Sequence, residues 1–371
     1  MLGLTVLTGP ASAAETREET EDWHYGGFVD ASYGLDFNFP ENHRWRSRTT
    51  TPRVNELSPN MALAYVRKDV STKSGWGMEF GIQGGYDSRE FGFGQDRPLV
   101  GGADTLRHFS HANASSLIPV GKGFTLTGGL FDSLIGFESL YARDNFNYSR
   151  SWIADNSPYK MFGLKGRYPI RDDLAMTVFI INGYWHLAHP NDLPSYGTQL
   201  AWKPTSRLTV KEAVYYGPDQ QNTALQFWRL FFDTIAEWKG ESVSVAFEHQ
   251  IGTEEMVERP GHPRTFWTGS ALFGRWDIEG PWSVALRPEL FWDRNGRQTG
   301  FQQFVKAITT TLEYKWAPAP QSVLFRLEHR YDESTGAQGG FFKGREFAPG
   351  VPRLTPGQHL LFFSVIWSFD S

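Results

Sequence analysis

The sequence contains no cysteine in 371 residues. This absence excludes disulfide bonds, thiolate metal sites, covalently attached c-type haem and cysteine nucleophiles. Long apolar runs are missing as well, and none approaches the roughly 18 residues that a membrane-spanning helix needs. Positive charge is not in excess, because 36 Lys and Arg stand against 41 Asp and Glu, for a formal net charge of −5. We therefore expect no nucleic-acid partner.

Aromatic residues and glycine are abundant instead. The chain has 14 Trp, 14 Tyr and 29 Phe, which together make 15% of its residues, and 38 Gly. Aromatic side chains are enriched in strands and glycine in the turns between them. The composition therefore predicts an all-β chain with many turns.

The first residues have the features of a secretion signal. Residues 1–13 hold a short apolar stretch that ends in Ala11-Ser12-Ala13, an A-x-A cleavage pattern, although a basic region is missing. We interpret residues 1–13 as a partial signal peptide. The acidic residues at 14–22 are expected to form a flexible lead-in. The remainder, 23–371, is predicted to be one domain of an exported protein of a Gram-negative bacterium.

A period of two is the strongest signal in the sequence. In 76–87, 282–293 and 323–332, apolar or aromatic side chains alternate with polar ones. Successive side chains of a strand point to opposite faces, so each segment has one apolar and one polar face. A soluble sandwich and a membrane barrel both produce this pattern.

Three observations favour the membrane barrel. The alternating segments run to about 10–14 residues, against about 5–6 in soluble sheets. Short and long connections alternate along the chain, which is typical of outer-membrane barrels. Aromatic residues stand at the ends of the apolar faces, as in the two girdles at membrane interfaces. The predicted interface aromatics are Trp76, Tyr86, Trp282, Trp292, Tyr314, Trp316, Trp367 and Phe369.

The pattern predicts a transmembrane antiparallel up-and-down β-barrel of about sixteen strands, with short periplasmic turns and long extracellular loops. The strands are expected near 23–36, 57–68, 76–87, 105–118, 123–132, 159–169, 174–186, 195–203, 208–217, 227–239, 242–251, 265–278, 282–292, 302–316, 322–332 and 358–369. A barrel of this width leaves an aqueous channel.

The segment 133–158 follows the fifth expected strand and is both aromatic and charged. Exposure of so many aromatic side chains to water is unfavourable, so we expect the segment to fold into the lumen and to narrow the pore. Its aromatics would pack on the inner wall. The charges that we expect to face the pore at this constriction are Glu138, Arg143, Asp144 and Arg150. An outward surface loop is the alternative.

Three stretches resemble one known family. They are "YGGFVDASYGLDFNFP" at 25–40, "NELSPNMALAYV" at 55–66 and "IGFESLYARDNFNYSRS" at 135–151. They are similar to outer-membrane β-barrel porins of the OmpL-like kind, and the resemblance is best over the first 150 residues. It implies a passive, solute-conducting barrel without a substrate identity. General porins also fold their third extracellular loop inward, and 133–158 has the same ordinal position.

Side chains on the polar face of the alternating strands are expected to line the pore. The main candidates are Arg229, Arg275, Arg287, Glu289, Arg326, Glu328 and Arg330. Basic and acidic candidates nearly balance over the whole chain, so no ion selectivity is predicted. The Arg and Glu residues could equally join neighbouring strands through cross-strand pairs. Glu212 breaks the scheme because it falls on the apolar parity, which would require a bulge or a different register.

Two other functional classes remain open. His108 and Ser110 lie two residues apart, as do the base and nucleophile of outer-membrane phospholipases, but no third member is found to orient the histidine. A barrel that sheathes a periplasmic or electron-transfer partner is the second alternative. No phosphate loop, dinucleotide fingerprint or hydrolase elbow occurs, so we predict no catalytic residue, cofactor or metal. The expected partners are outer-membrane lipid, lipopolysaccharide and small hydrophilic solutes, with a homo-oligomer such as a trimer left open.

Overall fold

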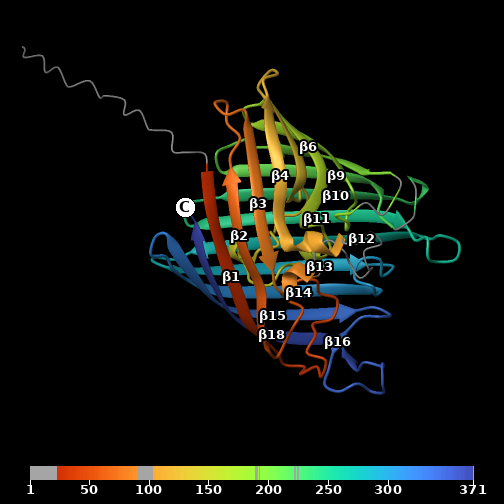
Figure 1. Cartoon of the computed structure of the whole chain (residues 1–371). Helices are drawn as coiled ribbons and strands as arrows, with labels where there is room; N and C mark the ends of the chain where they lie inside the picture. The colour runs from red at the N-terminus through yellow and green to blue at the C-terminus, as the bar shows by residue number, and fades with distance from the viewer. Residues whose placement is uncertain are drawn as a thin grey trace, which may run out of the picture.

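Strands that alternate apolar and polar side chains form almost the whole molecule. The computed structural model describes residues 23–89, 103–188, 191, 193–220, 223 and 225–370. Within these residues, sixteen strands close into one antiparallel barrel (Figure 1). The expected signal peptide and lead-in lie outside the described residues.

The strands pair in chain order, and the last one closes on the first. They are β1 (Trp23–Asp36), β2 (Leu57–Lys68), β3 (Trp76–Gly84), β4 (Phe109–Ile118), β5 (Phe124–Asp132), β6 (Lys160–Arg171), β7 (Leu174–Ile181), β8 (Ser195–Trp202), β9 (Leu208–Pro218), β10 (Trp228–Lys239), β11 (Val243–Glu255), β12 (Arg264–Asp277), β13 (Trp282–Asp293), β14 (Gln303–Trp316), β15 (Gln321–Thr335) and β18 (Gly357–Asp370). Gly26 of β1 pairs with Asp370 of β18, so the described ends of the chain lie side by side.

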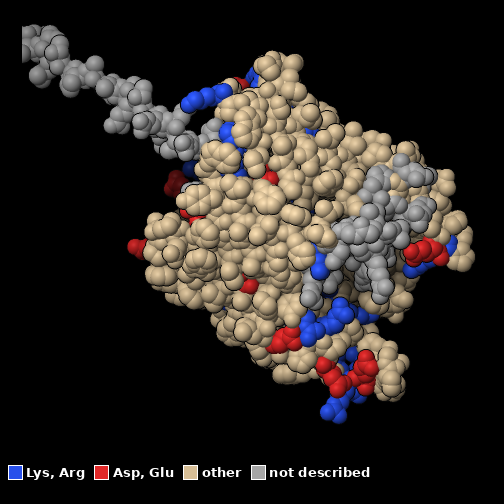
Figure 2. All heavy atoms as spheres, in the orientation of Figure 1, with Lys and Arg blue, Asp and Glu red and all other residues tan. Residues whose placement is uncertain are grey.

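The two faces of the wall follow the alternation. On β15, Phe325 and Leu327 are exposed on the outside, whereas Arg326 and Glu328 point inward and are buried. Figure 2 shows one side of the barrel, where charged side chains are sparse on the wall and gather near its ends. The expected arrangement of apolar outer and polar inner faces is therefore present.

The connections divide the barrel into two ends. At one end, the short-turn end, the strands are joined by 69–75, 119–123, 172–173, 203–207, 240–242, 278–281 and 317–320. At the other, the loop end, the connections are mostly longer and include 37–56, 133–159 and 336–356. The last of these carries the two-stranded sheet of β16 (Phe341–Phe342) and β17 (Leu354–Thr355).

Only short helices accompany the strands in the described residues. They are α1 (Tyr86–Arg89), η1 (Ala103–His108), η2 (Ala142–Asp144), α2 (Trp152–Asp155) and η3 (Leu225–Phe227). None of them is long and apolar enough to cross a bilayer as a helix. The strands of the barrel wall are therefore the elements that position the loops and the side chains of the inner face.

Tryptophan side chains cluster at the short-turn end of the outer face. They are exposed and belong to eight strands: Trp23, Trp76, Trp202, Trp238, Trp276, Trp282, Trp316 and Trp367. Trp282 packs edge-to-face on Tyr314, with ring centroids 4.8 Å apart, and Trp367 lies 5.6 Å from Phe369. Trp292 is exposed near the loop end, where it contacts Phe266. Such belts are typical of barrels that meet two membrane interfaces.

Tyr86 does not belong to a strand-end girdle. The strand that was expected to reach residue 87 ends at Gly84, and Tyr86 begins the short helix α1. Gly85 between them has φ of 132°, a conformation that side-chain-bearing residues rarely adopt. The chain therefore turns before Tyr86 can continue the alternation.

Candidate functional site: the barrel lumen and its loops

The segment 133–158 lies inside the barrel. At its start, the Gly136 N–H donates to Asp233 Oδ2 of β10 at 2.7 Å. Further along, the Tyr141 hydroxyl donates to Gln83 Oε1 of β3 at 2.8 Å. Because β3 and β10 lie almost opposite one another in the strand order, the segment crosses the lumen.

One ion pair joins this segment to β13. Arg287 Nη1 lies 2.8 Å from Glu138 Oε1, and the same nitrogen donates to the Ser149 carbonyl at 2.7 Å. Both charged side chains are almost completely buried. A buried charge needs a partner and further hydrogen bonds, and here the loop and the wall supply them to each other.

Backbone groups of the segment are satisfied by β15. The N–H groups of Tyr148 and Ser149 donate to the two carboxylate oxygens of Glu328, at 2.6 and 2.9 Å. Arg326 donates to the carbonyls of Ala142, Asn145 and Asn147. These bonds satisfy loop backbone that would otherwise be buried without partners.

Arg150 is buried, and it does not face open water. Its guanidinium lies 2.9 Å from Asp87 Oδ2 of α1 and also donates to the Leu140 carbonyl. Burial raises the pKa of Asp87 to about 6, against the opposing effects of Arg150 and the Thr51 N–H. Glu138 and Arg150 thus differ from the expectation that the loop charges face the pore, because an unpaired buried charge is costly and both find partners.

Arg143 and Asp144 keep contact with water. The side chain of Asp144 is 47% exposed, while Arg143 lies 3.4 Å from Asp144 and 3.4 Å from Asp370 at the end of β18. The guanidinium of Arg143 also covers the ring of Phe28 on β1. Of the four charges expected at the constriction, these two are the ones that meet solvent.

A second segment, 37–56, also enters the lumen, and the sequence reasoning missed it. Arg48 Nη2 lies 2.8 Å from Asp155 Oδ2, and both side chains are buried. Trp45 packs on Phe362, an inward side chain of β18, with centroids 5.7 Å apart. The signal that could have revealed it is Trp45-Arg46-Ser47-Arg48, an aromatic and basic run like that of 133–158. The loop-end half of the lumen is therefore packed with two segments of this chain.

The predicted pore-lining residues point inward, but most are paired and buried. Arg330 lies within 3.0 Å of both Glu289 and Asp332. Arg229 lies 3.0 Å from Asp219 and 2.9 Å from Glu254. Burial raises the pKa of Asp219, but Arg229 outweighs this effect and holds it below its usual value. Among the predicted pore-lining set, Arg275 is the member that keeps a partly exposed side chain, at 21%.

Other inward side chains remain open to water in the half nearer the short turns. Lys165 and Arg167 of β6 face inward, next to Thr127 and Thr125 of β5; Lys165 is partly exposed and Arg167 is exposed. Lys211 of β9 and Glu237 of β10 are partly exposed. The alternation of the sequence had also placed Lys165, Arg167 and Glu237 on the inner face, although alternation cannot tell which inward residues a loop covers.

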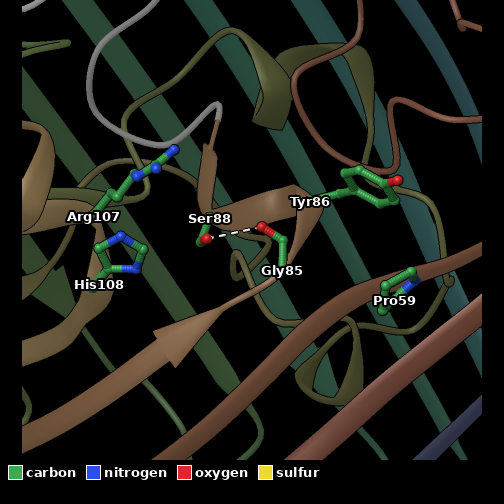
Figure 3. Close-up of a pocket in the computed structure, with 6 residues that line it drawn as sticks. All are labelled: Pro59, Gly85, Tyr86, Ser88, Arg107 and His108. Atoms are coloured by element: carbon green, nitrogen blue, oxygen red, sulfur yellow. Dashed lines mark hydrogen bonds between the residues drawn. The ribbon is translucent and has the colours of Figure 1, made fainter.

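A pocket of about 330 Å³ opens beside α1 at the loop end. Figure 3 shows Arg107 and His108 on one side and Tyr86 and Pro59 on the other. Between them, the Ser88 hydroxyl donates to the Gly85 carbonyl at 2.8 Å. The pocket is where the structure places Tyr86.

The residues of the hydrolase alternative are separated by structure. His108 ends η1 and is exposed, whereas Ser110 is buried in β4. Among the described residues, no hydrogen bond joins these two side chains, and no group of three or more acidic or histidine side chains could hold a metal ion. The two side chains therefore lack the contact expected between a general base and its nucleophile.

Comparison with known proteins agrees with the barrel fold. The family model described as "Putative beta-barrel porin-2, OmpL-like" matches residues 23–369. This chain belongs to that porin family. No curated protein sequence matches it.

Solved structures similar to this porin share its fold at low sequence identity. An anion-selective porin from Comamonas acidovorans has 12% identity and a TM-score of 0.57, over 94% of this chain and 99% of that one. The outer-membrane channel DcaP of Acinetobacter baumannii has 9% identity and a TM-score of 0.57, over 94% and 97%. OmpT of Vibrio cholerae in a trimer form has 8% identity and a TM-score of 0.54, over 94% and 99%. The porin is accordingly an outer-membrane channel protein of bacteria.

Proposed function

We propose that this porin is a passive diffusion channel for small hydrophilic solutes or ions, narrowed by residues 133–158. The observation that carries the proposal is the path of this segment from Asp233 on β10 to Gln83 on β3, across a closed barrel. A barrel of this width is wet unless something fills it. A loop that bridges the wall sets the size of what passes.

The water-exposed inner charges support a hydrophilic solute. Lys165, Arg167, Lys211, Glu237 and Arg275 all lie on the inner face and keep contact with water. Charged side chains in a lumen favour permeation of polar and ionic solutes over apolar ones. The outer face offers the complementary surface, since its tryptophan belt suits contact with lipid and lipopolysaccharide.

The sheath alternative receives less support. A sheath barrel needs a lumen that another chain can enter. Here Arg48 and Asp155 form a buried ion pair between the two segments, 37–56 and 133–158, that occupy the loop-end half of the lumen. Because segments of this chain occupy that half of the lumen, another chain has less room to enter, and we favour a non-enzymatic solute channel over a sheath.

We also propose that the porin forms a trimer through β2 and β4. Small side chains occupy the outer positions of these two strands, namely Ala62, Ala64, Ala112, Ala114 and Ser116. The similar OmpT of Vibrio cholerae has been solved in a trimer form. Mass measurement of the complex in mild detergent, with Ala64→Trp as the disrupting variant, tests this proposal.

The experiment on the channel is single-channel conductance in planar bilayers. The wild type is compared with a deletion of 137–150 and with a control deletion of 345–350, which is exposed in the outer loop that carries β16. A conducting wild type whose conductance rises only with the first deletion supports the proposal. A folded wild type that never conducts overturns the channel. Conductance that is unchanged by deletion of 137–150 overturns the constriction.

A further inference from the structure

A row of four polar side chains crosses the outer, lipid-facing side of the barrel. Glu212 of β9 is the direct neighbour of Thr234 of β10, which neighbours His249 of β11, which neighbours Ser270 of β12. The register of β9 is unbroken on both sides, so neither a bulge nor a shift explains Glu212. The glutamate that broke the sequence alternation does face outward.

The row is surrounded by apolar side chains. The next row towards the short turns consists of Val210, Ala236, Phe247 and Leu272. The next row towards the loops consists of Val214, Phe232, Ile251 and Thr268, and the Thr268 hydroxyl donates to a backbone carbonyl. Leu200 and Leu290 end the polar row on its two sides.

The row lies at the middle of the membrane-spanning wall. On β9 and its neighbours, Trp202 and Trp238 mark the short-turn end, whereas Tyr196 and Tyr216 mark the loop end. Glu212 lies about midway between these aromatics along the strand. Ionisable side chains at this depth are unfavourable against lipid, and their presence points to a function.

Two polar atoms of the row take no part in the hydrogen bonds within it. The Thr234 hydroxyl donates to Glu212 Oε2 at 2.5 Å, and His249 Nδ1 lies 2.8 Å from Ser270 Oγ. Within the described part of the chain, Glu212 Oε1 and His249 Nε2 have no hydrogen-bond partner. One is an acceptor, and the other is an imidazole nitrogen that can donate. They stand on opposite sides of Thr234.

We propose that this wall binds a second copy of the same chain around a two-fold axis near Thr234, with Glu212 of each copy bonded to His249 of the other. Two copies in one membrane are related by an axis along the membrane normal. Such an axis exchanges left and right at equal depth, so β9 of one copy faces β11 of its partner. The surface is therefore self-complementary, which singles out a second copy as the occupant.

The distances allow this pairing. With strands about 4.8 Å apart and tilted by about 40°, Glu212 and His249 differ in depth by about 6 Å. Facing sheets lie about 10 Å apart, and a glutamate and an imidazole that lean towards each other span this combination. Polar contacts between membrane-spanning elements stabilise association, and a two-fold axis supplies the contact twice.

This contact differs from the proposed trimer face. β2 and β4 lie on the other side of the barrel from β10 and β11 in the strand order. Both contacts can form in one membrane, and either can be absent without the other. The inference rests on the outer-membrane barrel and is independent of whether it conducts.

The cysteine-free chain makes a direct test available. Thr234→Cys is cross-linked with a short bis-methanethiosulfonate reagent in isolated outer membranes that contain the full-length protein, because facing sheets about 10 Å apart are too far for a direct disulfide between the two cysteines. Thr310→Cys on β14 is the matched control, because Thr310 is also an outward threonine near mid-wall, between Leu286 and His329. We expect a cross-linked dimer from the first variant and none from the second. Folding is checked in each case by heat-modifiable electrophoretic mobility.

Exchange of the two residues tests whether Glu212 of one copy contacts His249 of the other. In the Thr234→Cys background, Glu212→His or His249→Glu alone should lower the dimer yield about tenfold, since each places like groups face to face. The double variant, Glu212→His with His249→Glu, should restore the yield. Absence of a dimer from folded Thr234→Cys, an equal yield from Thr310→Cys, or failure of the folded double variant to recover would each overturn the proposal.

Discussion

Arg287 on β13 and Glu138 in the segment 133–158 form an ion pair inside the barrel, with Nη1 and Oε1 2.8 Å apart. The two residues are 149 positions apart in the sequence. Glu289 lies 3.4 Å from the same guanidinium and also accepts from the Trp152 N–H of the segment. The inner wall of β13 therefore holds the crossing segment through charges at two points.

Removal of one member of this pair should release the segment from the wall. Arg287→Leu leaves the Glu138 carboxylate buried and unpaired, which typically costs about 3–5 kcal/mol. We expect a lower urea midpoint of unfolding and a larger or noisier single-channel conductance. The double variant Arg287→Leu with Glu138→Leu should recover much of the stability, because it leaves no unpaired charge.

The control for this prediction is Arg345→Leu, which removes an exposed arginine from the outer loop. It should change neither stability nor conductance. If Arg287→Leu destabilised the barrel as expected and left its conductance identical to the wild type, the pair would not control the position of the segment.

The charge of Arg167 should influence which ions pass. This side chain is exposed on the inner face of β6. A unit charge about 4 Å from a passing ion in water contributes about 1 kcal/mol, which changes relative permeability severalfold. Arg167→Glu should therefore shift the reversal potential in a salt gradient towards cation preference. Lys306→Glu carries the same charge change on the outer face of β14 and should leave the potential unchanged; equal shifts from both variants would contradict a lumenal role for Arg167.

The wall of the barrel was predictable because alternation depends only on local sequence. The strand expected at 282–292 is Trp282–Asp293, and the one expected at 57–68 is Leu57–Lys68. The strand expected to reach residue 87 ends at Gly84, since a glycine with positive φ follows. The period of two places side chains on a face, and a single special backbone conformation is enough to end it.

The packing of the lumen was only partly predictable. The aromatic composition of 133–158 indicated that the segment is buried, but it could not identify Asp87 as the partner of Arg150. Parity placed Arg326 and Arg330 on the inner face, yet whether an inward arginine meets water or a loop depends on contacts between distant segments. Segment 37–56 was missed because its local signal is short: only the run Trp45–Arg48 resembles the aromatic and charged composition of 133–158.

The Trp282–Tyr314 contact should stabilise the barrel at the short-turn end. The rings meet edge-to-face with centroids 4.8 Å apart, and the two residues are direct cross-strand neighbours. Such pairs contribute about 0.5–1.5 kcal/mol beyond the area that they bury. We expect Trp282→Ala and Tyr314→Ala each to lower the free energy of unfolding, measured by urea denaturation. The loss in the double variant should be smaller than the sum of the two single losses by about 0.5–1.5 kcal/mol. Strict additivity of the losses would show that the contact contributes nothing of its own.

Asp87 should make stability depend on pH near 6. Burial raises the pKa of this carboxyl to about 6, above its ordinary value of 3.8, although Arg150 and the Thr51 N–H act in the opposite direction. Because the folded state binds this proton more tightly than the unfolded state, the contribution is fully present below about pH 4 and is lost as pH rises through 6. We therefore expect the wild type to gain stability from Asp87 between pH 7.5 and 5. Asp87→Asn, which resembles the protonated form, should show a smaller change in urea midpoint over this interval. Equal pH dependence in the two proteins would mean that the carboxyl has an ordinary pKa and that its pair with Arg150 stays charged throughout.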